Sequence, residues 1–427
     1  MSIKTNIDTL NQDKRDKINN ELKLELKGPG MSKWIFPFDL IGDDLFVPFA
    51  YGIRQLKLKR PLRDTFTVMN RKFEGILRDE QLIVKKEAID ILDKQGSVII
   101  SAYPGFGKTI GSISLACRMK LKTLIIVNKI VLINQWADSI NTFCPSAKIQ
   151  KLTTKSEFDN ECDFFIMNAI NVPKMGPNFF KNIGNCIVDE LHLIMAEGLS
   201  KSLQNICPRY LIGLSATPYR EDGLDGLISY FFGDDKIIRK LHRKHIVYKV
   251  ETGLKIELEL SDSTGKVNWG AVLKEQSENQ ERNDLIVKIV EHFKDRTFLI
   301  LCKRVDQANY FIKALENKGE NVDSLVGSKQ DFNRDCRILV GILSKVGTGF
   351  DWSKLNGLIL ACDLEAFFIQ SLGRVFRTKD TIPIVFDIID KNPILMKHYN
   401  SRVETYRECG GIIKSFNRQF PEFFDTL

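Results

Sequence analysis

Residues 98–109 read Val-Ile-Ile-Ser-Ala-Tyr-Pro-Gly-Phe-Gly-Lys-Thr, and this stretch decides the fold. An apolar strand runs into a glycine-containing loop, and Thr109–Met119 then has the pattern of a helix. Strand, loop and helix in this order are typical of a phosphate-binding loop. Gly105 and Gly107 let backbone N–H groups approach phosphate oxygens, and the helix N-terminus carries partial positive charge. The stretch predicts a nucleotide site in an α/β domain with a parallel sheet.

Each position of this loop has an expected role with ATP and Mg²⁺. Lys108 is expected to reach the β- and γ-phosphates, and Thr109 to bind the Mg²⁺. A glutamine upstream, Gln81, can read the adenine edge, although a solvated amide is the alternative. The expected nucleotide-binding residues in this part of the chain are Arg78, Gln81, Ala102, Pro104, Gly105, Phe106, Gly107, Lys108 and Thr109.

Two carboxylates follow another apolar strand, Cys186–Val188. Asp189 can meet the same Mg²⁺ directly or through water, and Glu190 can orient or deprotonate the attacking water. Two solvated acids at a strand end are the alternative interpretation. The next strand, Tyr210–Leu214, ends in Ser215-Ala216-Thr217. Its hydroxyls can link the acidic motif, which includes His192, to the other lobe by hydrogen bonds, and an ordinary turn is the alternative.

A second α/β series begins near residue 284 and has no phosphate loop of its own. Its segment Gln370-Ser371-Leu372-Gly373-Arg374-Val375-Phe376-Arg377 places two arginines three residues apart, on one helical face. Gln370, Arg374 and Arg377 are therefore expected to act on the γ-phosphate held by the first lobe. In the glycine-rich loop at 347–351, Gly349 and Asp351 are candidates for a phosphate or the ribose, with a tight turn as the alternative.

Composition sets broad limits on the class of protein. A length of 427 residues suggests two or three domains, and 43% hydrophobic with 27% charged residues is a globular mixture. The net charge of +8 fits a polyanionic partner, although solubility alone also explains it. Nine cysteines without a Cys-x-x-Cys pair argue against zinc and indicate a reducing, intracellular compartment. The N-terminus lacks a secretory apolar region, and no apolar run is long enough to span a membrane.

Apolar strands that alternate with helices predict an α/β fold with two parallel-sheet lobes and a small β-rich N-terminal domain. A hairpin is expected where His245–Val250 and Leu254–Leu260 flank a turn. The predicted order is a flexible lead-in or short helix (1–20), the β-rich domain (21–74), lobe 1 (75–235), an interlobe connection with the hairpin (236–282), lobe 2 (283–405) and a C-terminal tail (406–427).

In this order, the segments resemble those of superfamily 2 helicases over residues 75–390. The resemblance implies two RecA-like lobes that bind ATP. It rests on Gln81, motif I at Ala102–Thr109, motif Ia near Val127–Trp136, motif II at Asp189–His192, motif III at Ser215–Thr217, motif IV near Phe298–Lys303, motif V at Ser344–Asp351 and motif VI at Gln370–Arg377.

Within the superfamily, the chain resembles XPB-like DNA helicases, including phage and large DNA virus enzymes such as the poxvirus transcript-release helicase. The features are Asn134-Gln135-Trp136, an Arg-Glu-Asp element within Leu214–Asp222, and Asp387, Asp390, His398, Arg402 and Tyr406. Motif II reads Asp-Glu-Leu-His, and motif VI lacks the second glycine of the DEAH RNA helicases. Both departures favour DNA.

The function expected from these residues and this resemblance is that of an ATP-dependent DNA helicase or translocase. Nucleic acid would be held mainly through its backbone, with DNA favoured over RNA. Protein partners could bind the N-terminal domain or the C-terminal tail, and the process could be transcription, replication, recombination or repair. An RNA-dependent ATPase and an ATP-switched nucleic-acid-binding protein are the alternatives.

Overall fold

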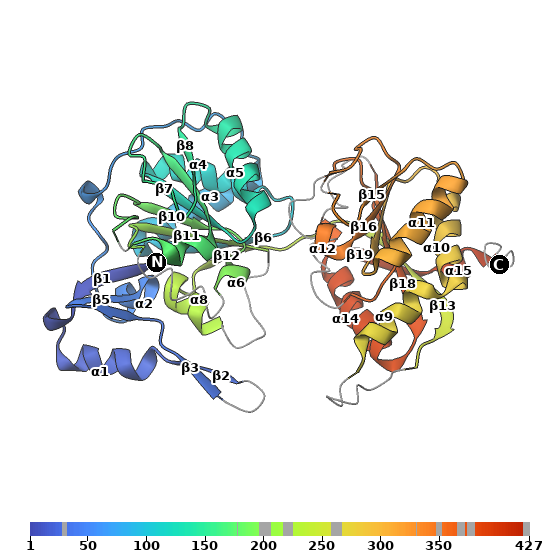
Figure 1. Cartoon of the computed structure of the whole chain (residues 1–427), viewed down its shortest axis with the longest axis horizontal. Helices are drawn as coiled ribbons and strands as arrows, with labels where there is room; N and C mark the ends of the chain where they lie inside the picture. Colours follow the sequence, from blue (N-terminus) through green and yellow to red (C-terminus); the bar gives the residue numbers. More distant parts are fainter. Residues whose placement is uncertain are drawn as a thin grey trace. The chain divides into compact units, whose positions relative to one another are not determined.

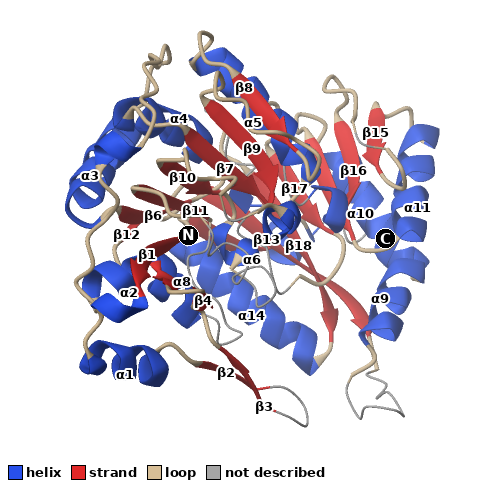
Figure 2. Cartoon of the chain, turned by 60° about the vertical axis from the view of Figure 1, so that its left-hand side comes forward, coloured by secondary structure: helices blue, strands red, loops and turns tan. Residues whose placement is uncertain are grey.

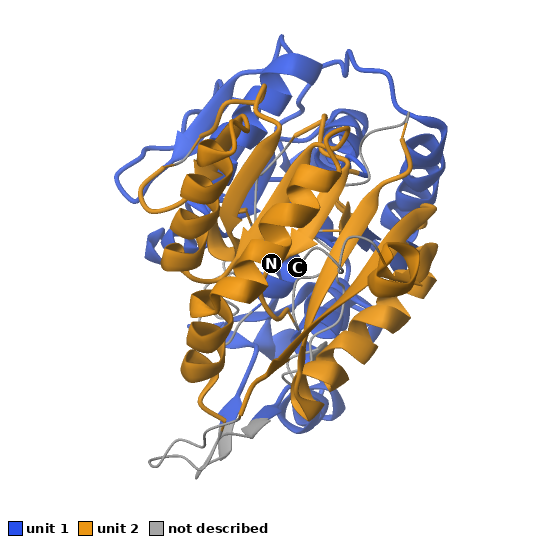
Figure 3. Ribbon diagram, turned by 90° about the vertical axis from the view of Figure 1, so that its right-hand side faces the viewer, with its two compact units in different colours: residues 1–102, 106–239 blue, residues 103–105, 240–427 orange. Residues whose placement is uncertain are grey.

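The computed structural model describes residues 1–27, 32–176, 178–195, 206–216, 225–257, 267–329, 331–346, 352–364, 372–373 and 381–421. The chain divides into two compact units, coloured separately in Figure 3. Unit 1 comprises Met1–Ala102 and Phe106–Arg239, and unit 2 comprises Tyr103–Gly105 and Lys240–Leu427. Each unit contains a seven-stranded sheet, labelled strand by strand in Figure 1.

The sheet of unit 1 is parallel throughout, in the order β12-β6-β11-β10-β7-β9-β8. Its central strands are fully buried and mostly apolar, because helices cover both faces of a parallel sheet. The strands are β6 (Ser97–Ala102), β7 (Thr123–Val127), β8 (Ile149–Leu152), β9 (Phe164–Asn168), β10 (Asn185–Val188), β11 (Tyr210–Ser215) and β12 (Lys236–Arg239). The helices are α3 (Asp79–Gln95), α4 (Lys108–Met119), α5 (Ile130–Phe143), α6 (Leu191–Ile194) and α8 (Asp225–Phe232).

The N-terminal segment forms a small antiparallel sheet, β1-β5-β4, and a separate two-stranded ribbon, β2-β3. Of the two alternatives expected for residues 1–20, the structure has the short helix, which is most of α1, and it adds strand β1 before that helix. The elements are β1 (Ser2–Asn6), α1 (Gln12–Glu21), β2 (Leu24–Lys27), β3 (Ser32–Ile35), β4 (Asp39–Ile41), β5 (Asp44–Pro48) and α2 (Phe49–Arg54). Ile3, Val47 and Phe49 share one buried cluster with Ile99 and Phe231, so this segment packs into the core of unit 1.

The sheet of unit 2 is also parallel, in the order β15-β16-β14-β17-β18-β13-β19. Figure 2 distinguishes its strands from the helices around them. The strands are β13 (His245–Lys255), β14 (Phe298–Cys302), β15 (Val322–Leu325), β16 (Ile338–Ile342), β17 (Gly357–Leu360), β18 (Ile384–Lys391) and β19 (Gly411–Ser415). The helices are α9 (Trp269–Glu278), α10 (Gln280–His292), α11 (Val305–Asn317), α12 (Leu343–Val346), α14 (Pro393–Glu408) and α15 (Phe416–Gln419).

One expectation about unit 2 is wrong. Residues 245–255 form the single strand β13, which pairs in parallel with β18 and β19, instead of one arm of a hairpin. Gly253, at φ +75°, marks a register irregularity within that strand. The segment predicted as a C-terminal tail packs on unit 2: it completes α14 and supplies β19, and Phe416 behind them is fully buried against Phe386.

Two further expectations concern the cysteines and a membrane. All nine cysteines are free thiols, and eight of them are buried. Among the helices in the described ranges, none combines the length and apolar character needed to cross a bilayer.

Candidate nucleotide-binding site

The loop after β6 has the backbone geometry that its glycines predict. Gly105 and Gly107 adopt φ of +86° and +89°, a region that side-chain-bearing residues rarely enter. A Cβ on Gly107 would lie 2.3 Å from Gln81 Nε2, so a larger residue would also have to displace the Gln81 amide. Helix α4 begins immediately afterwards at Lys108, which leaves its first N–H groups available to an anion.

The Lys108 ammonium interacts electrostatically with both acidic residues of motif II. Its Nζ donates a hydrogen bond to the carbonyl oxygen of Ala102, at 2.7 Å. Burial lowers the pKa of Lys108, while the carboxylates of Glu190 and Asp189 act to raise it. Lysine and acids that are far apart in sequence therefore share one electrostatic environment at the carboxyl ends of β6 and β10.

Gln81 connects the start of α3 to the phosphate loop. Its Nε2 donates to the carbonyl oxygen of Phe106 at 2.7 Å, and its Oε1 accepts from the backbone N–H of Arg78 at 2.8 Å. The Arg78 guanidinium donates to the same Phe106 carbonyl. The Gln81 side chain is 4% exposed and keeps one N–H beyond these bonds, so the role of Gln81 toward adenine stays a prediction.

Asp189 is fixed at the end of β10 by two donors. The indole Nε1 of Trp136, on α5, donates to Asp189 Oδ2 at 2.8 Å, and the backbone N–H of Glu190 donates to Oδ1 at 3.0 Å. Burial, and then the neighbouring Glu190 carboxylate, raise the pKa of Asp189 to about 6, against the opposing effects of Trp136 and Lys108. A cation bound at this carboxylate would offset that cost of ionisation.

Glu190 has an unusual backbone conformation. Its φ of +48° and ψ of +53° lie in the left-handed region, where a residue with a Cβ is destabilised by roughly 1–2 kcal/mol. Among the residues that the structure describes, only Lys57 and Lys120 share a positive φ without being glycine. Such conformations persist where the surroundings enforce them, and they concentrate at functional sites.

His192 joins the acidic motif to the next strand. Its Nδ1 lies 2.8 Å from Ser215 Oγ, at the end of β11, and 3.6 Å from Glu190 Oε2. His192 is 8% exposed and Ser215 is fully buried. Motif III therefore contacts the acidic motif within unit 1. The coupling of this contact to the other lobe stays a prediction, and Thr217 lies outside the described residues.

Trp136 is expected only as part of the resemblance carried by Asn134-Gln135-Trp136, and that resemblance predicts no contact for its side chain. In the structure it contacts the acid expected to bind the metal. The available signal was chemical, because a tryptophan buried in an apolar helix face needs a partner for its N–H group.

The described residues fit ATP with Mg²⁺. Among the described residues, no cluster of three His, Cys, Asp or Glu side chains could bind a metal alone. Mg²⁺ commonly uses one or two protein oxygens together with phosphate oxygens and water. Thr109 Oγ1 and the Asp189 carboxylate are the protein oxygens that would hold it, with the nucleotide supplying the rest.

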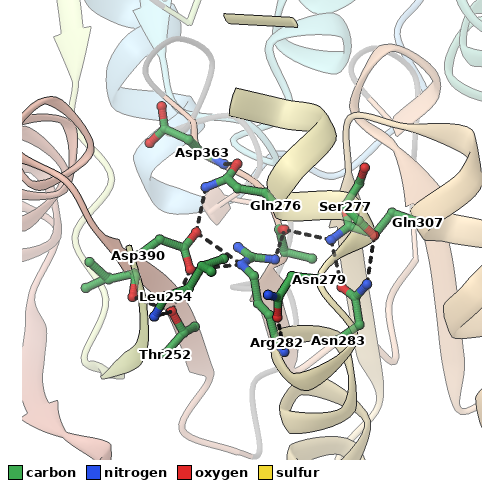
Figure 4. Close-up of polar contacts among 12 residues, drawn as sticks. Thr252, Leu254, Gln276, Ser277, Asn279, Arg282, Asn283, Gln307, Asp363 and Asp390 are labelled. Atoms are coloured by element: carbon green, nitrogen blue, oxygen red, sulfur yellow. Dashed lines mark hydrogen bonds and ion pairs between the residues drawn. The ribbon is translucent and has the colours of Figure 1, made fainter. Parts of the chain in front are cut away.

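The candidates Gln370, Arg374, Arg377, Gly349 and Asp351 all lie outside the described residues. The structure does describe residues 352–364, which precede motif VI. A buried ion pair contacts this segment at Ala361. Arg282 Nε lies 3.0 Å from Asp390 Oδ1, and both side chains are fully buried. Gln276 Nε2 donates to Asp390 at 2.7 Å, and Arg282 Nη1 donates to the Ala361 carbonyl oxygen at 2.8 Å (Figure 4).

A second buried arginine, Arg402, contacts Asp363 and Leu364 of the same segment, residues 352–364. Arg402 donates to both oxygens of Asp387, at 2.9 and 2.8 Å, and to Asp363 at 3.1 Å. It also donates to the Leu364 carbonyl oxygen at 2.7 Å, and His398 Nδ1 lies 2.6 Å from Asp363. The acidic and basic residues singled out in the sequence at the end of lobe 2 therefore anchor residues 361–364.

Comparison with known proteins agrees with this geometry. Residues 74–220 match the family model described as "Type III restriction enzyme, res subunit". The chain is 43% identical to "Putative helicase 161L" of Invertebrate iridescent virus 6, over 97% of this chain and all of the relative. It is 35% identical to "Putative helicase 055L" of Frog virus 3 (isolate Goorha), over 87% and 86% of the two chains.

A solved structure supports the fold. "S. cerevisiae Dbp5 bound to RNA and ADP BeF3" aligns with a TM-score of 0.55 at 12% identity, covering 88% of this chain and 95% of that one. The prediction of an α/β fold with two RecA-like lobes and a small N-terminal sheet is confirmed.

Proposed function

The chain belongs to the superfamily 2 helicases, with relatives in large DNA viruses, and we propose that it is an ATP-dependent motor that moves along DNA. Membership implies use of ATP with a divalent metal ion and binding of nucleic acid. The observation that carries the proposal is the shared environment of Lys108, Asp189 and Glu190 in unit 1. Residues from two distant motifs meet there with the chemistry of nucleotide hydrolysis.

The residues of unit 1 have separate roles in this proposal. Lys108 and the first N–H groups of α4 bind the β- and γ-phosphates. Thr109 and Asp189 would hold Mg²⁺, which neutralises phosphate charge when bound. Glu190 orients the attacking water and accepts its proton. Trp136 is a positioning residue, since its indole N–H fixes Asp189.

For the residues of motifs V and VI, the proposed roles rest on the sequence. Arg374 and Arg377 would supply arginine fingers that stabilise charge on the transferring phosphoryl group, assisted by Gln370. Gly349 and Asp351 would contact phosphate or ribose. The His192–Ser215 contact, extended by Thr217, would transmit the state of the acidic motif to the strand-end segments that follow β11.

DNA is the proposed track. The Asp-Glu-Leu-His reading of motif II and the resemblance to the XPB-like branch support DNA, as do relatives encoded by DNA viruses. Backbone binding without sequence preference suits a motor that must step along any sequence. The nine free cysteines support a reducing intracellular compartment as the place of action.

Steady-state ATPase assays with single-stranded DNA, duplex DNA and RNA test this proposal. We expect strong stimulation by DNA and weaker stimulation by RNA, followed by movement on tailed duplexes that depends on ATP. Lys108→Ala serves as the matched inactive control. Stimulation of ATP turnover by RNA alone would favour an RNA-dependent ATPase. ATP turnover that no polynucleotide stimulates would refute the proposal of a motor.

A further inference from the structure

We infer that unit 1 carries a second nucleic-acid contact, a basic cavity at the end of α4 remote from the phosphate loop, which binds phosphates of the strand. The cavity has a volume of about 470 Å³. Its lining contains five basic side chains and no acidic one; the basic residues are Arg71, Lys72, Lys85, Arg118 and Lys120. The inference rests on the proposed function for the presence of nucleic acid, but it concerns a different surface.

Hydrogen-bonded backbone holds the walls of this basic cavity. Lys120 caps α4 in the left-handed conformation, with φ +57°, and its N–H donates to the Ala116 carbonyl oxygen. The N–H of Met69 donates to the Lys120 carbonyl oxygen at 3.0 Å, and Val68 forms a β-bridge with Leu121. The segment that carries Arg71 and Lys72 is therefore tied to the end of the helix that carries Arg118.

Most of the positive charge in the basic cavity has no counter-charge. Arg71 forms an ion pair with Asp163 at 2.8 Å. Across the described residues, no carboxylate lies within 4.0 Å of the nitrogens of Lys72, Lys85, Arg118 or Lys120. Lys85 donates instead to Ser114 Oγ at 2.6 Å, and burial lowers its pKa, with Arg118 adding to the lowering. Unpaired cations gathered in one cavity repel each other, so a bound anion would relieve that repulsion.

The basic cavity is distinct from the candidate nucleotide site. Arg118 follows Lys108 by ten positions on the same helix, which separates them by about 15 Å along its axis at 1.5 Å per residue. The phosphate loop opens from the carboxyl end of β6, whereas Lys120 leads into the amino end of β7. Both sites can therefore be occupied at the same time.

The distribution of the charges favours a strand of nucleic acid. The three exposed cations, Lys72, Arg118 and Lys120, come from two separate chain segments, as suits repeated phosphates of a backbone. Phe73 adds an aromatic wall, stacked on Phe143 with ring centroids 6.0 Å apart. Basic side chains beside an aromatic ring are the combination that single-strand binding surfaces use.

The test is a triple variant, Lys72→Gln, Arg118→Gln and Lys120→Gln, compared with the wild type. A matched control removes three exposed lysines that do not line the basic cavity, by Lys59→Gln, Lys94→Gln and Lys313→Gln. Binding of a labelled oligothymidylate, without ATP, is measured by fluorescence anisotropy over a series of KCl concentrations. Basal ATP turnover and the unfolding temperature should be unchanged in both variants.

Three lost phosphate contacts should reduce the slope of log K against log[salt] by about 2, at roughly 0.7 per contact on a single strand. Affinity near 0.1 M salt should then fall by on the order of 100-fold, while the control stays near the wild type. An unchanged slope in the triple variant, an equal loss in the control, or equally good competition by polyglutamate would overturn this inference and leave the proposed function intact. A wild-type chain that binds no polynucleotide would overturn both.

Discussion

Trp136→Phe isolates one hydrogen bond at the candidate site. The change keeps an aromatic ring on α5 but removes the indole N–H that donates to Asp189 Oδ2 at 2.8 Å. A hydrogen bond to a charged group contributes about 1.5–3 kcal/mol, and each 1.4 kcal/mol is a factor of ten in rate. If the bond positions the metal-binding carboxylate, kcat for ATP should fall by about 10- to 100-fold, with KM changing by less than about threefold.

Trp352→Phe is a suitable control for this change. Trp352 is 2% exposed and donates its indole N–H to the Arg334 carbonyl oxygen at 3.1 Å, in unit 2. Both variants lose an indole donor from a buried position, so both should lose stability in urea unfolding, while only Trp136→Phe should lower kcat. A kcat for Trp136→Phe within twofold of the Trp352→Phe value would refute the positioning role of Trp136.

Other residues give further tests. Lys108→Ala should abolish ATP turnover without changing the circular dichroism spectrum, because the phosphates lose their main cation. Arg374→Ala should stop single-turnover hydrolysis yet leave the affinity for a fluorescent ATP analogue nearly intact; collapsed affinity would mean that it binds the ground state. Asp390→Ala should lower the free energy of unfolding by about 3–5 kcal/mol, because its arginine partner stays buried without a counter-ion. Asp335→Ala, at an exposed ion pair, should leave the midpoint of the same urea titration nearly unchanged. Burial lowers the pKa of His245 below its ordinary 6.5, so the neutral imidazole favours the folded state. The contribution of His245 to the free energy of unfolding should be complete above pH 6.5 and should decrease as the pH drops from 6.5 toward the pKa of the folded state. His245→Gln should remove this part of the dependence of stability on pH.

Local signals explain why so much of both sheets could be predicted. Strands β6, β10 and β14 are fully buried and mostly apolar, because helices exclude water from both faces of a parallel sheet. Strand β13 was predicted wrongly because Glu251-Thr252-Gly253 has the composition of a turn. Its pairing with β18 and β19 outweighs that local preference, and the sequence contains no direct signal for such distant partners.

At the candidate site, too, the contiguous motif could be predicted from the sequence and the contacts between distant residues could not. The phosphate loop is contiguous, so its glycines and lysine could be recognised together. The Trp136–Asp189 bond joins residues 53 positions apart, and the His192–Ser215 contact joins residues 23 apart. Only the order of strands in the folded sheet brings these side chains together.

The strained backbone at Glu190 has a physical reason that follows from the chemistry of the pair. In an extended strand, successive side chains point to opposite faces, so Asp189 and Glu190 would be separated if β10 simply continued. The left-handed turn at Glu190 ends that alternation, and its carbonyl oxygen then accepts the first N–H of the following turn, from Leu193 at 2.8 Å. Both carboxylates consequently act on the pKa of Lys108. A conformation that costs about 1–2 kcal/mol thus lets two adjacent acids serve one site, which a relaxed strand could not provide.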